Sequence, residues 1–435
     1  MSSPIRNCLK LLAADALRHA DGEQAVLRYL AQEPITGSVR VLALGKAAAA
    51  MWRGAAASLS SQVRAALVIT NVAAGSTDFV AGAVRPQWQM AAHPVPDERS
   101  LAAGAAAMAF VQTTPVDETL LVLLSGGASA LCEVLAEGVT LPALRALQQT
   151  LLAANIPIAD LNAIRQSLSS IKAGGLARCC PAGAAIRQLI ISDVPDDNVR
   201  VVGSAPFITQ PVGPLNLTAL PEFWQQWCRQ HLIVSAGWVG SERELTGAAS
   251  NPELALVSNR VQTAVIASNR SVRAALQAHA GQKNWPVIAN ETYADECTAV
   301  VTRIADRVRN GPSGLYLFGG ECHLQLPAEP GRGGRNQQLA LALSLALQDC
   351  PGIDMLSLAT DGVDGDSDAA GAVFRSIDGL QTERQRSAAQ AALATASSYD
   401  YWQGRGGLLF TGATGSNVAD LLLCWKSSLP SQTLL

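Results

Sequence analysis

The segment from Gly331 to Gln338 places Arg332 and Arg335 in a glycine-rich turn, directly ahead of the helix-length apolar run Leu339 to Leu347. A helix N-terminus presents unpaired N–H groups and a partial positive charge. An arginine fork matches the oxygens of a phosphate or a carboxylate. The segment therefore predicts a site for a multiply charged oxyanion: a phosphate, a carboxylate or both. The alternative is a surface turn with solvated arginines.

Two more glycine turns follow apolar runs of strand length. Lys46 stands in Gly45-Lys46-Ala47-Ala48, where a lysine reaches a phosphate as a mobile point charge. In Ser125-Gly126-Gly127-Ala128-Ser129 the glycines permit close backbone approach, and Ser129 is placed to cap the next helix. The alternatives are a solvated lysine and a tight turn that packs strand on helix. No complete G-x-x-x-x-G-K-[ST] phosphate loop is present.

Carboxylates follow two other strand-like runs. Asp193 comes after Gln188 to Ser192, and Asp361 and Asp364 come after Met355 to Ala359. Beside anion-binding turns, such groups either hold a divalent cation or take a hydroxyl proton as a base. The alternative is a solvated acidic loop. The spacing of the second group does not match a calcium-binding EF-hand loop.

Hydroxyl-bearing and imidazole side chains complete the candidates. Thr411 to Asn417 offers backbone amides and hydroxyls, and we expect a helix to begin near Val418. His93 is either a ligand-facing side chain or part of a rigid turn between prolines. The sequence does not decide between these two roles of His93, and the segment from Thr411 to Asn417 is by itself a helix cap.

The elements that must position these turns alternate between strand-like and helix-like stretches, so the chain is expected to be α/β with largely parallel sheets covered by helices. In open sheets of this kind, ligands bind outside the carboxyl ends of the strands. The expected strands are Val39 to Leu44, Ala65 to Thr70, Thr119 to Leu124, Gln188 to Ser192, Thr263 to Ala267, Leu315 to Phe318 and Met355 to Ala359. The expected helices are Leu101 to Val111, Leu141 to Ala154, Asp295 to Arg309 and Leu339 to Leu347.

A chain of 435 residues suggests two domains. The rhythm is lost from Thr209 to Pro252, so we expect domains at 1–245 and 246–435, with the last helix free to pack back on the first domain. A net charge of −3 argues against nucleic acid as a partner. Nine cysteines without C-x-x-C spacing predict reduced thiols. Without a signal peptide or a membrane span, we expect a cytoplasmic monomer or homodimer that acts on small molecules.

In order, the chain carries Gly45-Lys46-Ala47-Ala48, His93-Pro94-Val95-Pro96-Asp97-Glu98, Ser125 to Leu131, Asn162 with Arg165, Lys172 with Gly174, Ser192-Asp193-Val194-Pro195, Gly319-Gly320-Glu321, Gly331 to Gln337, Ala359 to Gly365, Asp368 to Ala372 and Thr414-Gly415-Ser416-Asn417-Val418. This series resembles the glycerate 2-kinase (MOFRL) family over residues 40 to 422. The resemblance implies a Rossmann-like N-terminal domain, a C-terminal α/β domain and an active site in the cleft between them. It implies transfer of phosphate from ATP to the 2-hydroxyl of D-glycerate, giving 2-phospho-D-glycerate and ADP, with Mg²⁺.

The resemblance makes Lys46 and Arg335 the active-site cations. Lys46 would neutralise the transferring phosphoryl group, and Arg335 would clamp a carboxylate or phosphate. On chemical grounds, Asp193 is a candidate base or metal ligand, and Asp361 and Asp364 are candidate Mg²⁺ ligands. The residues expected to bind substrate or phosphate are Ser125, Gly126, Gly127, Ser129, Arg165, Lys172, Arg332, Asn336, Thr360, Thr414 and Asn417.

The chain departs from the family pattern at several positions. Ala128 and Ala205 replace glycines, Gln166-Ser167 replaces a Lys-His pair, and Cys322-His323 replaces Thr-Thr. We expect catalysis to be retained, with substrate identity or affinity altered. The alternatives are a kinase for a related small sugar acid, an NAD(P)H-dependent hydroxypyruvate reductase, and a sensor that binds a sugar acid or nucleotide without turnover. A reductase would be supported by a strand-linked G-x-G-x-x-G, which the sequence lacks.

Overall fold

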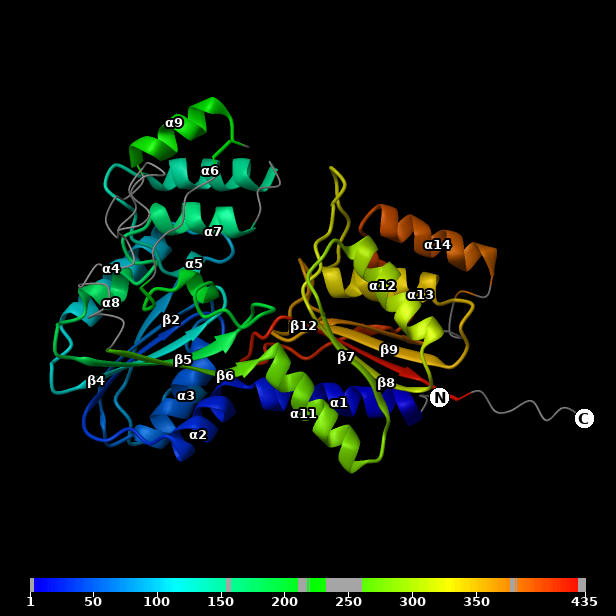
Figure 1. Cartoon of the computed structure of the whole chain (residues 1–435), viewed down its shortest axis with the longest axis horizontal. Helices are drawn as coiled ribbons and strands as arrows, with labels where there is room; N and C mark the ends of the chain where they lie inside the picture. Colours follow the sequence, from blue (N-terminus) through cyan, green and yellow to red (C-terminus); the bar gives the residue numbers. More distant parts are fainter. Residues whose placement is uncertain are drawn as a thin grey trace, which may run out of the picture. The chain divides into compact units, whose positions relative to one another are not determined.

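The computed structural model describes residues 4–153, 158–209, 217–218, 220–231, 260–375, 380 and 382–428. The chain divides into two compact units, drawn in Figure 1. The first unit comprises Gly22–Ser192 and Asn198–Ile266, and the second comprises Met1–Asp21, Asp193–Asp197 and Ala267–Leu435. The boundary predicted between residues 245 and 246 lies outside the described residues.

The first sheet has the strand order β3-β2-β1-β4-β5-β6. Neighbouring strands from β3 to β5 pair in parallel, which confirms the predicted parallel sheet for this part of the chain. The central strands are buried apolar runs, as strands covered on both faces must be. The strands are β1 (Val39–Leu44), β2 (Val63–Thr70), β3 (Gln87–Met90), β4 (Thr119–Ser125), β5 (Ala185–Ser192) and β6 (Val261–Ser268).

Helices of the first unit follow these strands and pack beside them. Helix α3 directly follows β1, and α5 directly follows β4, so each begins at the carboxyl end of a strand. A separate apolar cluster joins α6, α7 and α9. The helices are α2 (Gly22–Gln32), α3 (Ala48–Leu59), α4 (Glu98–Gln112), α5 (Ala128–Leu131), α6 (Leu141–Ala153), α7 (Ile158–Ser167), α8 (Gly175–Cys179) and α9 (Glu222–His231), with short 3₁₀ turns at Ser76–Asp78 and Val202–Ser204.

The second sheet has the order β11-β10-β9-β12-β8-β7 and differs from the prediction. Only β7 and β8 pair in parallel, because β12 runs antiparallel between β8 and β9, and β10 runs antiparallel to β9. The expectation of a largely parallel sheet is therefore wrong for this unit. The strands are β7 (Val287–Tyr293), β8 (Gly314–Gly320), β9 (Ile353–Ala359), β10 (Gly371–Arg375), β11 (Leu408–Leu409) and β12 (Asp420–Lys426).

Strand β12 occupies the segment where we expected the last helix. Its residues Leu421 to Cys424 are buried, so both faces of the strand are covered. A short continuous apolar run suits a buried strand and a buried helix equally well, and periodicity alone does not separate them. The segment is a strand because its backbone pairs with β8 on one side and with β9 on the other.

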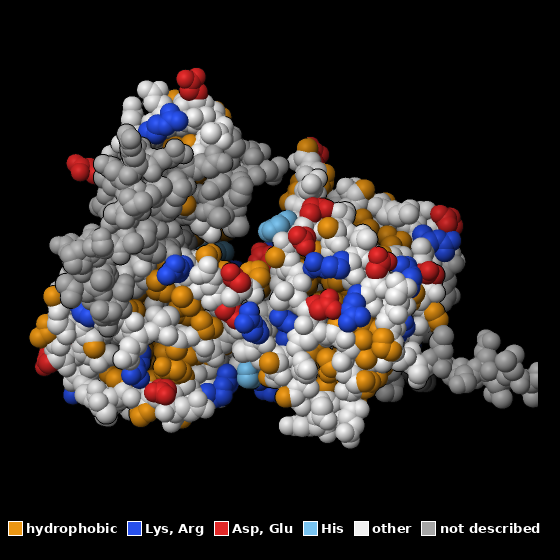
Figure 2. Space-filling view, in the orientation of Figure 1, with side chains coloured by type: hydrophobic (Ala, Val, Ile, Leu, Met, Phe, Trp, Pro, Cys, Tyr) orange, Lys and Arg blue, Asp and Glu red, His pale blue; other side chains and the backbone are white. Residues whose placement is uncertain are grey.

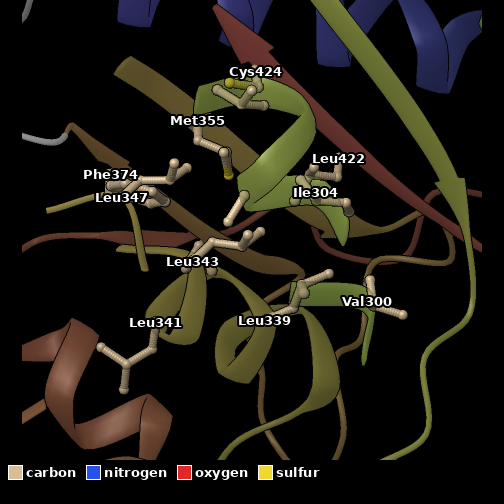
Figure 3. Packing of buried hydrophobic residues seen from close by; sticks show 14 of the residues in the cluster. Val300, Ile304, Leu339, Leu341, Leu343, Leu347, Met355, Phe374, Leu422 and Cys424 are labelled. Atoms are coloured by element: carbon tan, nitrogen blue, oxygen red, sulfur yellow. The ribbon is translucent and has the colours of Figure 1, made fainter. Parts of the chain in front are cut away.

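Helices cover both faces of the second sheet. Helix α1 packs with α11 and contacts β9 and β12, while α12 and α13 share a core with the opposite face. Figure 3 shows that core, to which Val300, Ile304, Leu339, Leu343 and Met355 belong. The helices are α1 (Pro4–Ala20), α11 (Asn269–Gln282), α12 (Cys297–Asn310), α13 (Arg335–Ala346), α14 (Glu383–Ala394) and α15 (Ser398–Gln403). In the described ranges, no helix combines the length and apolar character that crossing a membrane requires.

Candidate functional site

The structure brings two of the predicted turns together at the carboxyl edge of the first sheet. Strands β1 and β4 are parallel neighbours, with Leu44 opposite Leu124. The N–H of Lys46 donates to the carbonyl oxygen of Gly126 at 2.9 Å, and the N–H of Ala47 donates to Ser125 Oγ at 3.0 Å. The lysine turn and the Gly-Gly turn therefore form one hydrogen-bonded loop pair.

Two glycines in this loop pair have positive φ and close neighbours, and at Gly45 these neighbours leave no room for a side chain. A Cβ on Gly45, whose φ is +126°, would lie 2.2 Å from Ser125 Oγ. A Cβ on Gly127, whose φ is +84°, would lie 3.1 Å from both Lys46 Cγ and His93 Cδ2. Lys46 and His93 thus flank Gly127. Sequence alone left His93 open between two roles, and the structure puts its ring beside the lysine.

Ser129 lies next to a loop with unusual backbone geometry. Ser204 Oγ donates to Ser129 Oγ at 2.9 Å. Ser204 and Ala205 have φ values of +61° and +53°, in the left-handed region that favours glycine. Ala205 stands where the family pattern has glycine, and its side chain opposes this left-handed backbone. Gln166, another departure, is buried and donates to the Ser204 carbonyl oxygen at 3.5 Å.

Two predicted cations of the first unit surround a buried carboxylate. Lys172 Nζ forms an ion pair with Glu133, and both side chains are buried. Ser169 Oγ also donates to Glu133. Burial lowers the pKa of Arg165, while the charge of Glu133 opposes that shift. Breaking a buried pair typically costs about 3–5 kcal/mol. The pairing therefore gives Lys172 a structural role, which sequence reasoning missed because nothing singled out Glu133.

The N-terminus of α13 is occupied by an internal carboxylate. Asp364 Oδ1 accepts from the backbone N–H of Asn336 at 3.0 Å, and Oδ2 accepts from that of Gln337 at 2.8 Å. A Cβ on Gly334 would lie 2.3 Å from Asp364, so the glycine permits this approach. Two of the amides that we expected to bind a ligand oxyanion are thus held by the protein itself. Asp364 acts as the helix cap, and both its oxygens are engaged.

Arg335, the first residue of α13, is fixed by two carboxylates. Its Nε donates to Asp420 Oδ2 at 2.7 Å, its Nη2 reaches Asp420 Oδ1 at 3.4 Å, and its Nη1 pairs with Glu321. Asp420 lies opposite Gly320 and Ala359, the last residues of β8 and β9. The guanidinium therefore stands at the carboxyl edge of those two strands.

The charges around Arg335 shift each other's protonation. Burial raises the pKa of Asp420 to about 7, and Arg335 only partly offsets that rise. Burial alone would lower the pKa of Arg335. The nearby carboxylates of Asp420 and Glu321 outweigh this effect, so the pKa of the guanidinium is raised. Sequence reasoning missed Asp420, because we placed it at the start of a helix. The available signal was a carboxylate directly ahead of an apolar run.

Arg332 and Cys322 are engaged near this site. Arg332 pairs with Asp368 at 2.7 Å and stacks on the Tyr399 ring at 3.7 Å. Cys322, where the family pattern has threonine, is buried. A side-chain hydrogen bond to Cys297, together with burial, raises the pKa of its thiol.

Hydroxyl and amide side chains tie the remaining predicted residues together. Thr360 Oγ1 accepts from the N–H of Val418 at 2.9 Å, and Thr414 Oγ1 donates to the Thr360 carbonyl oxygen. Asn417 Nδ2 donates to Asp193 Oδ2 at 3.2 Å. Asp193, although distant in sequence, thus belongs to the same unit as Thr360 and Asn417.

The described residues contain no group of three or more histidine, cysteine, aspartate or glutamate side chains arranged to hold a metal ion. Asp361 Oδ1 accepts from the N–H of Val363 at 3.2 Å, which places this carboxylate in a local turn at the end of β9. A magnesium ion needs only one or two protein carboxylates when substrate phosphates supply other ligands.

Comparison with known proteins gives the family. Residues 8–227 match the family described as a domain of unknown function, DUF4147, and residues 314–420 match the MOFRL family. A D-glycerate 2-kinase from Thermotoga maritima is 30% identical over 88% of this chain and 90% of its own. The chain belongs to the glycerate 2-kinase (MOFRL) family. The resemblance stated from sequence is confirmed.

Further relatives of the family are similar to this protein over almost the whole chain. A glycerate 2-kinase from Pyrococcus horikoshii is 29% identical over 97% of both chains. The crystal structure of a glycerate kinase from Thermotoga maritima superposes with a TM-score of 0.77 at 25% identity, covering 97% of this chain and 99% of that one. The two-domain α/β fold expected of the family is therefore confirmed, and the chain is a kinase by family.

Proposed function

We propose that this protein is an ATP-dependent kinase that transfers a phosphoryl group to the 2-hydroxyl of D-glycerate. The observation that carries the proposal is family membership over nearly the full length, with relatives named glycerate 2-kinases. The loop pair that joins Lys46 to Ser125 and Gly126 supports it, because phosphoryl transfer depends on positioning and charge stabilisation.

In the first unit, Lys46 and the Gly-Gly turn form the phosphate-binding part of the proposal. Lys46 would neutralise charge on the transferring phosphoryl group. Backbone amides of Ser125, Gly126 and Gly127 would approach phosphate oxygens without steric hindrance, since Gly127 has no side chain.

In the second unit, Arg335 would bind the substrate carboxylate or a phosphate. Its guanidinium is oriented before any ligand arrives, because Asp420 and Glu321 hold three of its nitrogens. A preoriented cation loses little entropy on binding. Asp193, which is hydrogen-bonded to Asn417, would take the proton of the 2-hydroxyl.

The oxygen donors of Asp361 suit Mg²⁺, and this residue would hold it together with nucleotide phosphates. The ion would neutralise charge on the phosphates. We leave Asp364 out of this set, because both its carboxylate oxygens accept hydrogen bonds from the start of α13.

The test is ADP release from MgATP with D-glycerate, L-glycerate or hydroxypyruvate as acceptor. ADP formation that depends on D-glycerate, with 2-phosphoglycerate as product, is the expected result. A parallel measurement follows NADH oxidation with hydroxypyruvate alone. NADH consumption without ADP formation would replace the kinase by a reductase, and ADP formation only with another sugar acid would change the substrate.

A further inference from the structure

A pocket of about 680 Å³ opens in the second unit, and Arg335 is not among the residues that line it. It lies between α11 and β7, with one residue from α12, and β7 is the edge strand of its sheet. Three of its lining residues are arginines: Arg270, Arg273 and Arg303. Figure 2 shows arginine or lysine side chains interspersed with acidic ones over the face that carries these elements.

Arg273 is a buried cation without a carboxylate in hydrogen-bond contact. Its residue is 5% exposed. Its Nε donates to Asn269 Oδ1 at 2.9 Å and its Nη1 donates to Asn290 Oδ1, so both of these partners are neutral amides. Burial and the neighbouring charge of Arg270 lower its pKa, and the charge of Asp197 only partly offsets that shift. A buried charge whose hydrogen-bond partners are neutral is costly, and an anion in the pocket would offset that cost.

The other two arginines are only partly neutralised. Arg270 lies 3.9 Å from its carboxylate partner Asp197, at the limit of an ion pair. Arg303 contacts Asp295 at 3.3 Å and the Thr292 carbonyl oxygen at 3.2 Å.

The acidic lining residue does not cancel these charges. Glu291 accepts from Arg307 Nε at 2.9 Å, and Arg307 is not a lining residue. Arg270 and Arg303 have carboxylate partners outside the lining, Asp197 and Asp295, and Glu291 has Arg307, so Arg273 is the lining cation that no carboxylate of the described residues contacts directly. The pocket has the charge of an anion site.

We propose that this pocket binds a phosphate group, either as free phosphate or as the monoester of a small metabolite. Arginine forks bind phosphate oxygens in pairs, and several guanidiniums around one pocket suit a dianion better than a single carboxylate. The volume falls in the range of small-molecule sites and leaves room for an organic part beside the phosphate. Gln277 and Asn290 also line the pocket.

Asn269 connects this site to the strand that holds Asp420. Its Oδ1 accepts from Arg273, and its Nδ2 donates to the carbonyl oxygens of Val418 and Asp420 at 3.0 and 2.9 Å. None of the residues that line the pocket belongs to those proposed for phosphoryl transfer. Phosphate binding here does not depend on the proposed kinase activity.

The experiment is isothermal titration calorimetry of the full chain with inorganic phosphate and with sn-glycerol 3-phosphate, at constant ionic strength. The variants are Arg270→Gln, Arg303→Gln and the double substitution, which spare the buried Arg273. Arg309→Gln is the matched control for the single variants. Arg309 lies on α12 outside the pocket, and its substitution removes one positive charge as each of theirs does. Circular dichroism verifies that each variant is folded.

We expect the double variant to lose one binding site or to bind it at least about tenfold more weakly, while Arg309→Gln binds like wild type. Tighter binding of the ester identifies a phosphate monoester as the ligand, and equal or weaker binding of the ester identifies free phosphate. The proposal is overturned if the double variant titrates like wild type, or if Arg309→Gln weakens binding as much. Kinase activity is measured separately, so loss of one proposal leaves the other intact.

Discussion

At the scale of single residues, the second unit depends on buried charges that are fixed by their partners. Asp364 is held by backbone amides, and Asp420 by the Arg335 guanidinium. Asp364 holds the N-terminus of α13, and Asp420 holds the Arg335 side chain. Substitutions at these positions are therefore measured for stability and for activity. Lys46 in the first unit lies in a turn whose backbone N–H donates to the carbonyl oxygen of Gly126.

Replacing Lys46 by alanine is expected to lower kcat by roughly 10² or more without lowering the melting temperature, because the charge is needed mainly in the transition state. ADP release with D-glycerate and thermal denaturation by circular dichroism are the measurements. Lys283→Ala, which removes an exposed lysine at the end of α11, is the control. Wild-type turnover by the Lys46 variant would remove this residue from the mechanism.

Asp420 predicts a pH dependence of stability. Its folded-state pKa of about 7 is above that of an unfolded aspartate, so ionisation at neutral pH opposes folding. Its contribution is fully present below about pH 4 and is lost as pH rises through 7. We expect Asp420→Asn to gain roughly 1–3 kcal/mol relative to wild type between pH 5 and pH 8.

Urea denaturation at both pH values measures that difference. The exposed Asp306 on α12 provides the control, as Asp306→Asn should follow wild type at both pH values. A difference between Asp420→Asn and wild type that does not change with pH would contradict a raised pKa.

At the scale of elements, α13 shows how a helix N-terminus is satisfied inside the protein. We expect Asp364→Ala to lower the free energy of unfolding by about 1–3 kcal/mol, because two buried amides lose their acceptor. Asp368→Ala removes an exposed carboxylate of the same loop and should cost less stability than Asp364→Ala. Chemical denaturation of both variants measures their free energies of unfolding. Equal losses of stability would argue against the capping role of Asp364.

At the scale of the whole molecule, the first helix belongs to the unit formed by the last part of the chain. Leu12 on α1 is 2% exposed, and α1 packs against β9, β12 and α11. Truncation of a buried leucine typically costs 2–5 kcal/mol, so we expect roughly that loss for Leu12→Ala. Hydrogen exchange of β9 and β12 amides is the measurement.

The neighbouring Leu11 is 66% exposed and supplies the matched control. Leu11→Ala should leave exchange in β9 and β12 unchanged, since surface substitutions usually change stability by less than roughly 0.5 kcal/mol. Unchanged protection in the Leu12 variant would show that α1 contributes little to the second unit.

The sequence by itself determined the elements whose signal is local. Strand β1 was predicted at its observed bounds, and the predicted β4 and β9 lie within two residues of theirs at each end. A buried parallel strand is a continuous apolar run, and a glycine turn after it marks where its carboxyl end lies. The Lys46 and Ser125 turns were therefore recognisable before their contact was known.

Only the tertiary structure decided what depends on partners distant in sequence. Asp420 meets Arg335 across 85 positions, and Asp364 meets Asn336 across 28. The antiparallel insertion of β12 likewise required the edges of β8 and β9 to be present. Local pattern cannot specify such contacts, because a buried charge or strand edge is satisfied by whichever group the fold brings to it.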